Sequence, residues 1–242
     1  MTFQRDAATP PAHRLALYWA PPPDSALARI GATWLGRDAT GAAVSNRPIP
    51  AGFDSARLDQ LTAAPRQYAL HATLKPPFVL AAGTEEEELT AAIRAAAREL
   101  APVTLPALEL RLLDGFLALT PSAPCPALDD LAGQCVAAFD RFRRPAPAAE
   151  LAKRRAAGLT SRQDGNLQRW GYPYVFEDFR FHVTLSERLG AAEAARLQPA
   201  LAELFAPVIG QPVDVSDITL FAQDGADRPF QERARFPLTG RP

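Results

Sequence analysis

The alternation of apolar and polar residues along the chain predicts short strands separated by helices. Leu15, Leu17 and Trp19 fall on one face and the intervening residues on the other, which is typical of a strand. Thr84 stands before a run of glutamates, a combination that favours the start of a helix. Strands are predicted at 14–20, 67–74, 103–113, 116–120, 175–185, 213–221 and 231–238. Helices are predicted at 25–35, 54–63, 84–100, 127–142, 147–157 and 191–205, and an irregular stretch at 159–173.

This order of elements favours an α+β fold with antiparallel sheets. Strands and helices do not alternate as a regular βαβ series would require, so a doubly wound parallel sheet is not expected. Pro76-Pro77 is predicted to end the strand at 67–74. We expect residues 1–13 to form a flexible tail and residues 14–242 to form a single domain.

Composition and charge indicate a soluble globular protein. The chain has 242 residues, of which 48% are hydrophobic and 22% charged, and its formal net charge is −1. No apolar stretch approaches the roughly 18 residues of a membrane span, and the N-terminus lacks the apolar segment of a secretory signal. We therefore expect a cytoplasmic protein without membrane contact. A charge so near zero also argues against a broad surface that coats nucleic acid.

Two of the three histidines occur in the same four-residue context. His71 begins the run HATL and His182 begins the run HVTL, about half the chain apart. Because side chains alternate along a strand, each histidine shares a face with the threonine two residues later, Thr73 or Thr184. An imidazole and a hydroxyl are thus expected to project together from each strand into one cleft. The third histidine, His13, is expected to be an exposed bystander.

This pair of H-x-T motifs suits chemistry at a phosphodiester. Attack on phosphorus needs a general base, the departing alkoxide needs a general acid, and two imidazoles with ordinary pKa values near about 6.5 can divide these roles. The hydroxyls of Thr73 and Thr184 can donate hydrogen bonds to phosphate oxygens, and Lys75, Arg180 or Arg188 can add positive charge. The reaction requires no metal and no cofactor.

Four runs of sequence extend this pattern: WLGRD at 34–38, HATLKPPF at 71–78, RWGYPYV at 169–175 and FRFHVTL at 179–185. The paired motifs resemble those of the two-histidine phosphoesterase superfamily, which includes RNA 2′,5′-ligase-like proteins and cyclic nucleotide phosphodiesterases. The four runs together are similar to one bacterial branch, whose members are typically encoded beside phosphonate-degradation genes. The resemblance covers roughly residues 14–240.

The resemblance implies a bilobal fold, with two antiparallel sheets and outer helices around a central cleft, a pseudo-twofold axis and one motif from each lobe. The lobes are expected to interleave in sequence. It implies that His71 and His182 are the acid–base pair and that Thr73 and Thr184 bind phosphate.

The genomic association implies a cyclic phosphate from carbon–phosphorus bond cleavage. The candidate is 5-phosphoribosyl 1,2-cyclic phosphate, opened to ribose 1,5-bisphosphate. The expected partner is therefore a small phosphorylated substrate, and the protein is expected to be a monomer.

Further candidates for substrate contacts lie near the motifs. Arg162, Arg169, Tyr172 and Tyr174 precede the second motif, and this stretch can form a wall or lid that grips a second phosphate. Tyr18, on the first predicted strand, is a further candidate for substrate binding.

Three alternative functions stay open. A zinc hydrolase needs three or four ligands, whereas the sequence offers two motif histidines, scattered carboxylates and no H-E-x-x-H run. An RNA 2′,3′-cyclic phosphodiesterase or 2′,5′-ligase-like enzyme needs a basic groove with aromatic platforms. A nucleotide-binding module without turnover would use the motifs for binding alone. The sequence contains no P-loop and no dinucleotide-binding glycine run.

Overall fold

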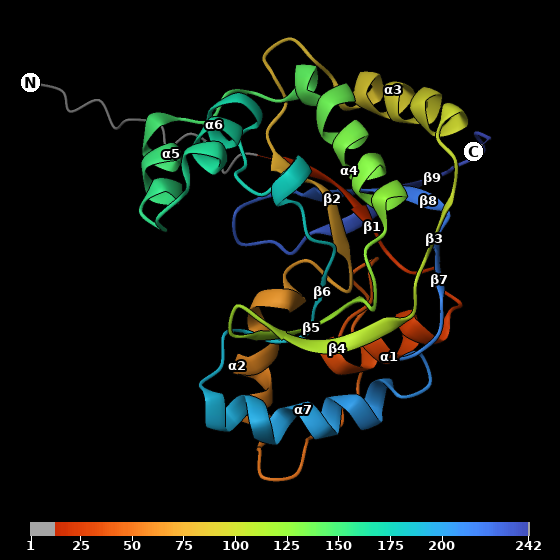
Figure 1. Cartoon of the computed structure of the whole chain (residues 1–242), viewed down its shortest axis with the longest axis vertical. Coiled ribbons are helices and arrows are strands. Elements are labelled where there is room, and N and C mark those ends of the chain that lie inside the picture. Colours follow the sequence, from red (N-terminus) through yellow and green to blue (C-terminus); the bar gives the residue numbers. More distant parts are fainter. Residues whose placement is uncertain (1–12, 242) are drawn as a thin grey trace, which may run out of the picture.

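The computed structural model describes residues 13–241 and shows an α+β fold of two lobes (Figure 1). The upper lobe in Figure 1 contains a four-stranded antiparallel sheet in the order β2-β1-β8-β9, covered by two helices. Its strands are β1 (Arg14–Trp19), β2 (Ala72–Phe78), β8 (Asp217–Gln223) and β9 (Gln231–Pro237). Its helices are α3 (Glu86–Glu99), against β8 and β9, and α4 (Pro126–Ala138), against β2.

The lower lobe contains a three-stranded antiparallel sheet in the order β4-β5-β6, with three helices beneath it (Figure 1). Its elements are β4 (Leu108–Leu113), β5 (Phe116–Pro121), β6 (Val183–Thr184), α1 (Ala26–Leu35), α2 (Ser55–Arg66) and α7 (Ala191–Phe205). A separate antiparallel pair joins β3 (Val103–Leu105) to β7 (Val213–Val215). The remaining elements are α5 (Ala148–Arg155), α6 (Ser161–Trp170) and the 3₁₀ turns η1 (Asp140–Phe142) and η2 (Phe176–Asp178).

The lobes interleave along the chain, as expected. After β1 the chain forms α1 and α2 in the lower lobe and then returns to the upper sheet as β2, which pairs with β1. One apolar cluster includes Leu17 of β1, Leu119 of β5 and Leu197 of α7, so it extends through both lobes. This shared cluster packs elements of both lobes against one another.

Local signals in the sequence account for most helix boundaries. The side chains of Ser25 and Asp54 accept hydrogen bonds from the first turns of α1 and α2, as N-caps do. Glu86–Glu88 place negative charge in the first turn of α3, where the helix dipole favours it. The β4–β5 turn is Asp114-Gly115, with φ of 48° and 91°, as a tight hairpin turn requires.

The prediction that Pro76-Pro77 ends a strand is wrong. β2 begins at Ala72 and continues through both prolines to Phe78. Proline lacks the N–H that a central strand must donate, but β2 is an edge strand of its sheet, and an edge strand tolerates this loss.

The prediction of an irregular stretch at 159–173 is also wrong, because these residues contain α6. Leu167 and Trp170 are the only large apolar residues of this helix, too few to show a helical hydrophobic pattern. The missed signal was the capping box, in which Thr160 accepts from the main-chain N–H of Gln163 and the Gln163 side chain accepts from the main-chain N–H of Thr160.

The strand predicted at 175–185 is mostly irregular. It contains η2, with Phe176 at a φ of 54°, and the two-residue strand β6. Pro106 divides the strand predicted at 103–113 into β3 and β4. The tail predicted at 1–13 lies outside the described residues except for His13. The ring nitrogens of His13 lie 3.0 Å from the carboxylates of Glu86 and Asp224.

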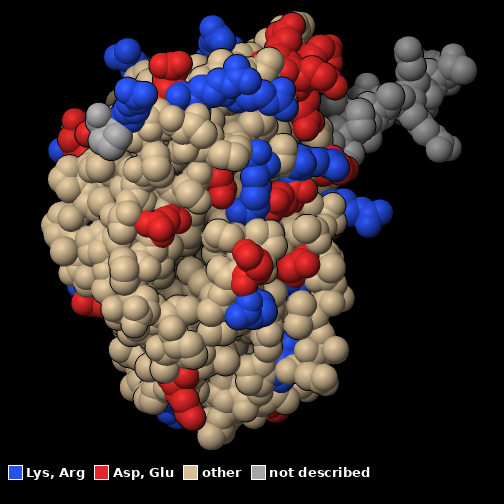
Figure 2. Space-filling model, turned by 90° about the vertical axis from the view of Figure 1, so that its right-hand side faces the viewer, with Lys and Arg blue, Asp and Glu red and all other residues tan. Residues whose placement is uncertain are grey.

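Charged side chains of both signs gather over the upper lobe on the face drawn in Figure 2, whereas the lower lobe there is mostly uncharged. This mixture matches the net charge of −1. Among the described residues, no helix has the length and apolar character needed to span a membrane.

Candidate active site

The two motif histidines are held by the same main-chain contact. Each lies one residue before its strand, β2 or β6, and its Nδ1 atom approaches the carbonyl oxygen two residues earlier. The distance is 3.0 Å from His71 to Ala69 and 2.7 Å from His182 to Arg180. Because a carbonyl oxygen can only accept, Nδ1 carries the proton in both rings. The Nε2 atom of each ring is therefore left for chemistry.

Aromatic rings enclose His71. The ring of Tyr18 lies 4.0 Å from the imidazole, centroid to centroid, and that of Tyr68 lies 5.6 Å away. Burial lowers the pKa of His71 to about 4. The hydrogen bond to Ala69 raises this pKa by less than burial lowers it, and the charge of His182 adds a still smaller lowering. The His71 ring is consequently neutral near pH 7.

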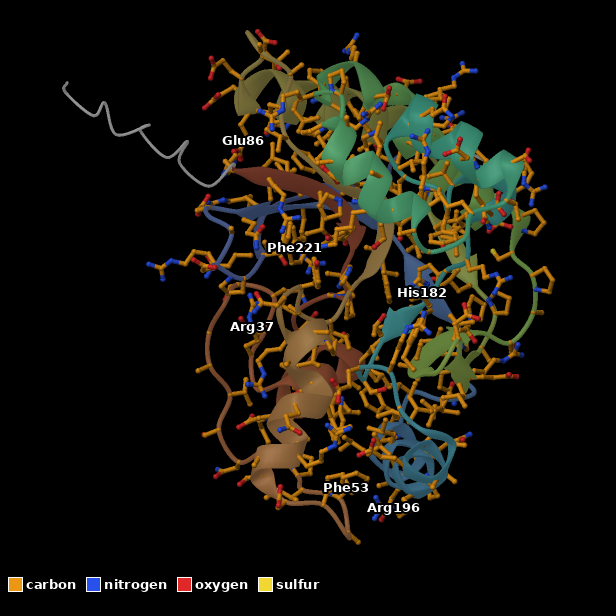
Figure 3. All side chains as sticks on the ribbon, turned by 90° about the vertical axis from the view of Figure 1, so that its left-hand side faces the viewer. Arg37, Phe53, Glu86, His182, Arg196 and Phe221 are labelled. Atoms are coloured by element: carbon orange, nitrogen blue, oxygen red, sulfur yellow. The ribbon has the colours of Figure 1, made fainter. Side chains whose placement is uncertain are left out.

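His182 occupies a more open position between the two lobes (Figure 3). Its ring lies 5.7 Å from that of Phe116 and lines a cleft of about 490 Å³. The cleft is also lined by Thr73 and Pro76 of β2 and by residues of the β4–β5 turn. The first turn of α6 and the segment that leads to His182 complete the lining. His71 itself is not among the residues that line this cleft, to which the first motif contributes Thr73 and Leu74.

The two threonines occupy corresponding positions after the histidines. Thr73 pairs with Tyr18 of β1 and lines the cleft. Thr184 pairs with Ala118 of β5 and is partly exposed. Their expected contact with phosphate stays a prediction.

Arg180 and Arg188 line the cleft at the β4–β5 turn. A guanidinium nitrogen of Arg188 donates to the carbonyl oxygen of Asp114, and a guanidinium nitrogen of Arg180 lies 3.9 Å from the Asp114 carboxylate. Both side chains are exposed, so they keep charge available for an anion. Arg162 also lines the cleft, but it already forms two bonds with Asp178.

Lys75 does not reach the cleft, which corrects its predicted role. It is 1% exposed, and its ammonium donates to the carbonyl of Val136 at 3.0 Å and lies 3.5 Å from Asp140. The prediction assumed strict alternation after His71. In the structure Tyr18 pairs with Thr73 but Leu17 pairs with Lys75, so a β-bulge redirects the lysine toward α4.

Two further predicted substrate contacts have other places in the structure. Arg169 does not line the cleft; it lies on α6 with its guanidinium 4.6 Å from the Trp170 ring, because the stretch expected to be irregular is a helix. Tyr18 is 1% exposed, and its ring packs against His71 because β1 is the central partner of β2. Tyr172 lines the cleft as expected of a wall residue.

All four tyrosines of the chain lie near the motifs, and of these only Tyr68 was not among the predicted candidates. Tyr172 and Tyr174 line the cleft, and their rings meet edge to face at 5.6 Å. The phenols of Tyr68 and Tyr172 add to the effect of burial in raising the pKa of Tyr18, so the cluster extends to His71. The signal for Tyr68 in the sequence was its position three residues before His71.

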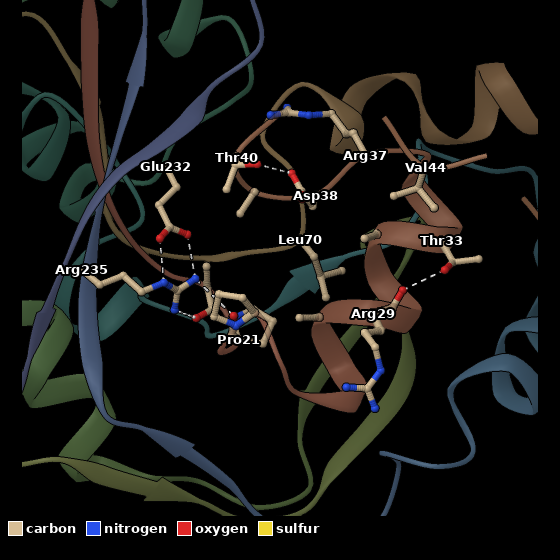
Figure 4. Close-up of a pocket in the computed structure, with 15 residues that line it drawn as sticks. Pro21, Arg29, Thr33, Arg37, Asp38, Thr40, Val44, Leu70, Glu232 and Arg235 are labelled. Atoms are coloured by element: carbon tan, nitrogen blue, oxygen red, sulfur yellow. Dashed lines mark hydrogen bonds and ion pairs between the residues drawn. The ribbon is translucent and has the colours of Figure 1, made fainter. Parts of the chain in front are cut away.

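A second cavity of about 350 Å³ lies between α1, the segment after it and β9 (Figure 4). Neither motif histidine lines it. Within residues 13–241, no group of three or more His, Cys, Asp or Glu side chains is arranged to hold a metal ion.

Both H-x-T motifs thus reach one cleft between the interleaved lobes, the first through Thr73 and the second through His182. The chain belongs to the family described as Protein of unknown function (DUF1045), whose model matches residues 73–231.

Two curated relatives are both named ribose 1,5-bisphosphate phosphokinase PhnN. The protein of Janthinobacterium sp. (strain Marseille) is 40% identical over 232 residues, which are 94% of this chain and 51% of that protein. The protein of Laribacter hongkongensis (strain HLHK9) is 37% identical over 220 residues, 90% of this chain and 50% of that protein. The chain thus spans about half the length of the curated relatives it matches.

Solved structures with a similar arrangement have low sequence identity to this chain. E. coli LigT complexed with 3′-AMP is 17% identical, with a TM-score of 0.42 over 96% of this chain and 99% of that one. TT0787 of Thermus thermophilus is 18% identical, with a TM-score of 0.44 over 95% of this chain and 100% of that one.

The lowered pKa of His71 predicts a pH-dependent stability. The pKa is about 4 in the folded protein and about 6.5 in an unfolded chain. Between these values the unfolded state binds more protons, so the free energy of unfolding falls as pH falls. From about pH 8 to about pH 5 we expect the wild type to lose about 2 kcal/mol more than His71→Asn.

Urea unfolding of both proteins at each pH measures this difference. Asparagine can still donate to the Ala69 carbonyl but does not titrate, so other groups cancel in the comparison. Equal losses in the two proteins would contradict the burial of a neutral imidazole.

Proposed function

We propose that the protein is a metal-independent cyclic phosphodiesterase that opens the cyclic phosphate of a phosphorylated sugar. The substrate we favour is 5-phosphoribosyl 1,2-cyclic phosphate, and the product is ribose 1,5-bisphosphate. The observation that carries the proposal is the shared contact of His71 and His182, which fixes both Nδ1 atoms on main-chain carbonyls and leaves both Nε2 atoms free.

The different surroundings of the two histidines favour one division of roles. His71 is neutral near pH 7, so its Nε2 atom accepts a proton from water as the water oxygen bonds to phosphorus. His182 has the more open position, and its Nε2–H protonates the departing sugar oxygen as the bond from phosphorus to that oxygen breaks. The proton gained by one ring and the proton lost by the other balance the hydrolysis.

The remaining cleft groups serve the phosphates. Thr73 and Thr184 donate hydrogen bonds to the non-bridging oxygens, where charge develops in the transition state. Arg180 and Arg188 bind the second phosphate of the substrate, because both guanidinium groups are exposed in the cleft near His182.

The names of the curated relatives support this substrate. A ribose 1,5-bisphosphate phosphokinase acts on the compound that the proposed ring opening would release. In those proteins the segment similar to this chain is about half the length, so the proposed phosphodiesterase and the named kinase would be joined in one chain. This association also supports the predicted place in phosphonate catabolism.

Kinase activity is not proposed for this chain. Its sequence has no P-loop, and of its two lysines Lys75 is buried against Val136 and Asp140. A phosphokinase needs a cation over the phosphates of its nucleotide.

An RNA 2′,3′-cyclic phosphodiesterase is a second candidate. The ring of Tyr174 is 44% exposed on the wall of the cleft, and an exposed aromatic face can stack on a nucleobase. The formal net charge of −1 gives no support to a long RNA-binding groove.

A metal-free assay against a panel of cyclic phosphates tests the proposed activity. The panel contains ribosyl 1,2-cyclic phosphates and RNA ends with a 2′,3′-cyclic phosphate, and phosphorus NMR identifies the bond that opens. We expect turnover of the phosphorylated sugar to survive exhaustive chelation. Replacing His71 or His182 with alanine should lower kcat by about 10²–10⁴-fold, because each removes one acid–base step.

Ligand binding should largely survive either alanine substitution. Binding without turnover in the wild type would instead indicate the nucleotide-binding module. Turnover that chelation abolishes would refute the metal-independent mechanism.

The division of roles predicts the pH dependence of kcat/KM. If His71 is the base, the loss of activity on the acid side of the profile occurs as pH falls through about 4, the pKa of its folded form. If His71 were the acid, activity would instead be lost above that same pH. A profile of kcat/KM measured from acid to alkaline pH separates the two assignments.

The role given to Arg188 predicts selectivity for a second phosphate. Arg188→Gln should lower kcat/KM about 10–100-fold for the 5-phosphorylated substrate, because a charged hydrogen bond contributes about 1.5–3 kcal/mol. Ribose 1,2-cyclic phosphate, which lacks that phosphate, should lose little.

Arg233→Gln serves as the control for charge alone. Arg233 lies on β9, outside the cleft, and forms an ion pair with Asp224. If Arg188→Gln lowered kcat/KM equally for both substrates, Arg188 would not bind the second phosphate.

A further inference from the structure

The run WLGRD places two buried side chains at the end of α1. Trp34 is fully buried and Arg37 is 6% exposed, and neither lines the cleft that contains His182. Gly36, at a φ of 78°, ends α1 between them and turns the chain so that both side chains point inward. The catalytic proposal gives neither residue a role.

Trp34 is bonded to the second motif. Its Nε1–H donates to the carbonyl of Leu185, the last residue of HVTL, at 2.7 Å in the buried interior. β6 pairs with β5 at two positions, Ala118 with Thr184 and Leu119 with Val183, and the main-chain N–H of Leu185 donates to the carbonyl of Leu117 at 2.9 Å. The tryptophan therefore supplies one of the contacts that fix the backbone after His182.

Arg37 is bonded to the segment that leads to the first motif. Its guanidinium donates to the carbonyl of Arg66, the last residue of α2, at 2.9 Å and to that of Phe230 at 2.7 Å. Phe230 in turn donates its main-chain N–H to Gln67 at 2.7 Å. Arg37 thus holds the start of the segment 66–71 in two ways, by its bond to the Arg66 carbonyl and, through Phe230, by the bond to Gln67.

The clamped segment carries strain at the residue that orients His71. Ala69 is 1% exposed and has a φ of 56°, a left-handed conformation that is unfavourable for alanine. Such a residue keeps this conformation only where its surroundings hold it. Its carbonyl is the acceptor for Nδ1 of His71, so the strained peptide sets the direction of the imidazole.

We propose that Trp34 and Arg37 are positioning residues that together fix the separation of the two H-x-T motifs. Trp34 lies in the last turn of α1 and Arg37 directly follows the Gly36 cap. Each of the two side chains is bonded to the backbone near a different motif. Figure 3 shows Arg37 and His182 both at the junction of the lobes. Movement of α1 would displace both histidines, and loss of either contact would release one of them.

The experiment compares Trp34→Phe and Arg37→Lys with a matched control. Phenylalanine keeps an aromatic ring and loses the N–H, and lysine keeps the charge but cannot span two carbonyls as a guanidinium does. The control is Arg235→Lys. Arg235 also donates to two main-chain carbonyls, those of Ala20 and Pro21, and lines the second cavity with Arg37 (Figure 4).

The first measurement uses histidine NMR and does not depend on activity. With three histidines in the chain, the nitrogen shifts report the tautomer and titration of each ring. We expect Arg37→Lys to alter His71 alone and Trp34→Phe to alter His182 alone, while Arg235→Lys leaves both unchanged. Wild-type signals for both rings in folded Arg37→Lys and Trp34→Phe would overturn the proposal.

The second measurement is kinetic and rests on the proposed function. We expect each variant to lower kcat about 10-fold or more with KM changed little, because misplaced catalytic groups affect the transition state more than ground-state binding. Loss of thermal stability equal to that of Arg235→Lys, with kcat unchanged, would assign the two residues a structural role only. If Arg37→Lys fails to fold, Trp34→Phe, which loses one hydrogen bond, decides the question. A wild type that turns over no cyclic phosphate would refute the proposed function and leave the NMR result intact.

Discussion

In the proposed reaction, two imidazoles from distant parts of the chain present the same ring nitrogen to one phosphorus atom. Carbonyl oxygens two residues before His71 and His182 meet this requirement, because each takes the Nδ1–H and turns Nε2 outward. Ring orientation is then set by the local backbone and not by a side chain that a charged substrate can displace. What remains is to place two short backbone segments correctly with respect to each other.

The interleaving of the lobes places these two backbone segments with respect to each other. His71 follows a helix that packs in the lower lobe and precedes a strand of the upper sheet, so its position depends on both lobes at once. The apolar cluster that continues from β1 to α7 opposes a hinge between them. A site built across two separate domains would need a large interface to reach the same rigidity.

The sequence predicted the elements and residues whose determinants are local. Paired H-x-T motifs, the Asp114-Gly115 turn and the capped helices depend on neighbours within a few residues, and the structure contains them. Lys75 could not be placed, because its direction depends on a bulge in the pairing with Leu17 of another strand. The low pKa of His71 could not be predicted for a similar reason, since it depends on rings of Tyr18 and Tyr68 that only the fold brings together.

The contrast between the two histidines has a chemical consequence. Acid and base must hold opposite protonation states at one pH, and two imidazoles in equivalent surroundings would titrate together. Tyr18 and Tyr68 remove this equivalence by enclosing His71, while His182 stays open beside Arg180 and Arg188. In the proposed reaction the enclosed side activates water and the open side receives the leaving sugar oxygen. The arginines then lie on the side of the sugar, where a second phosphate would be bound without approaching the attacking water.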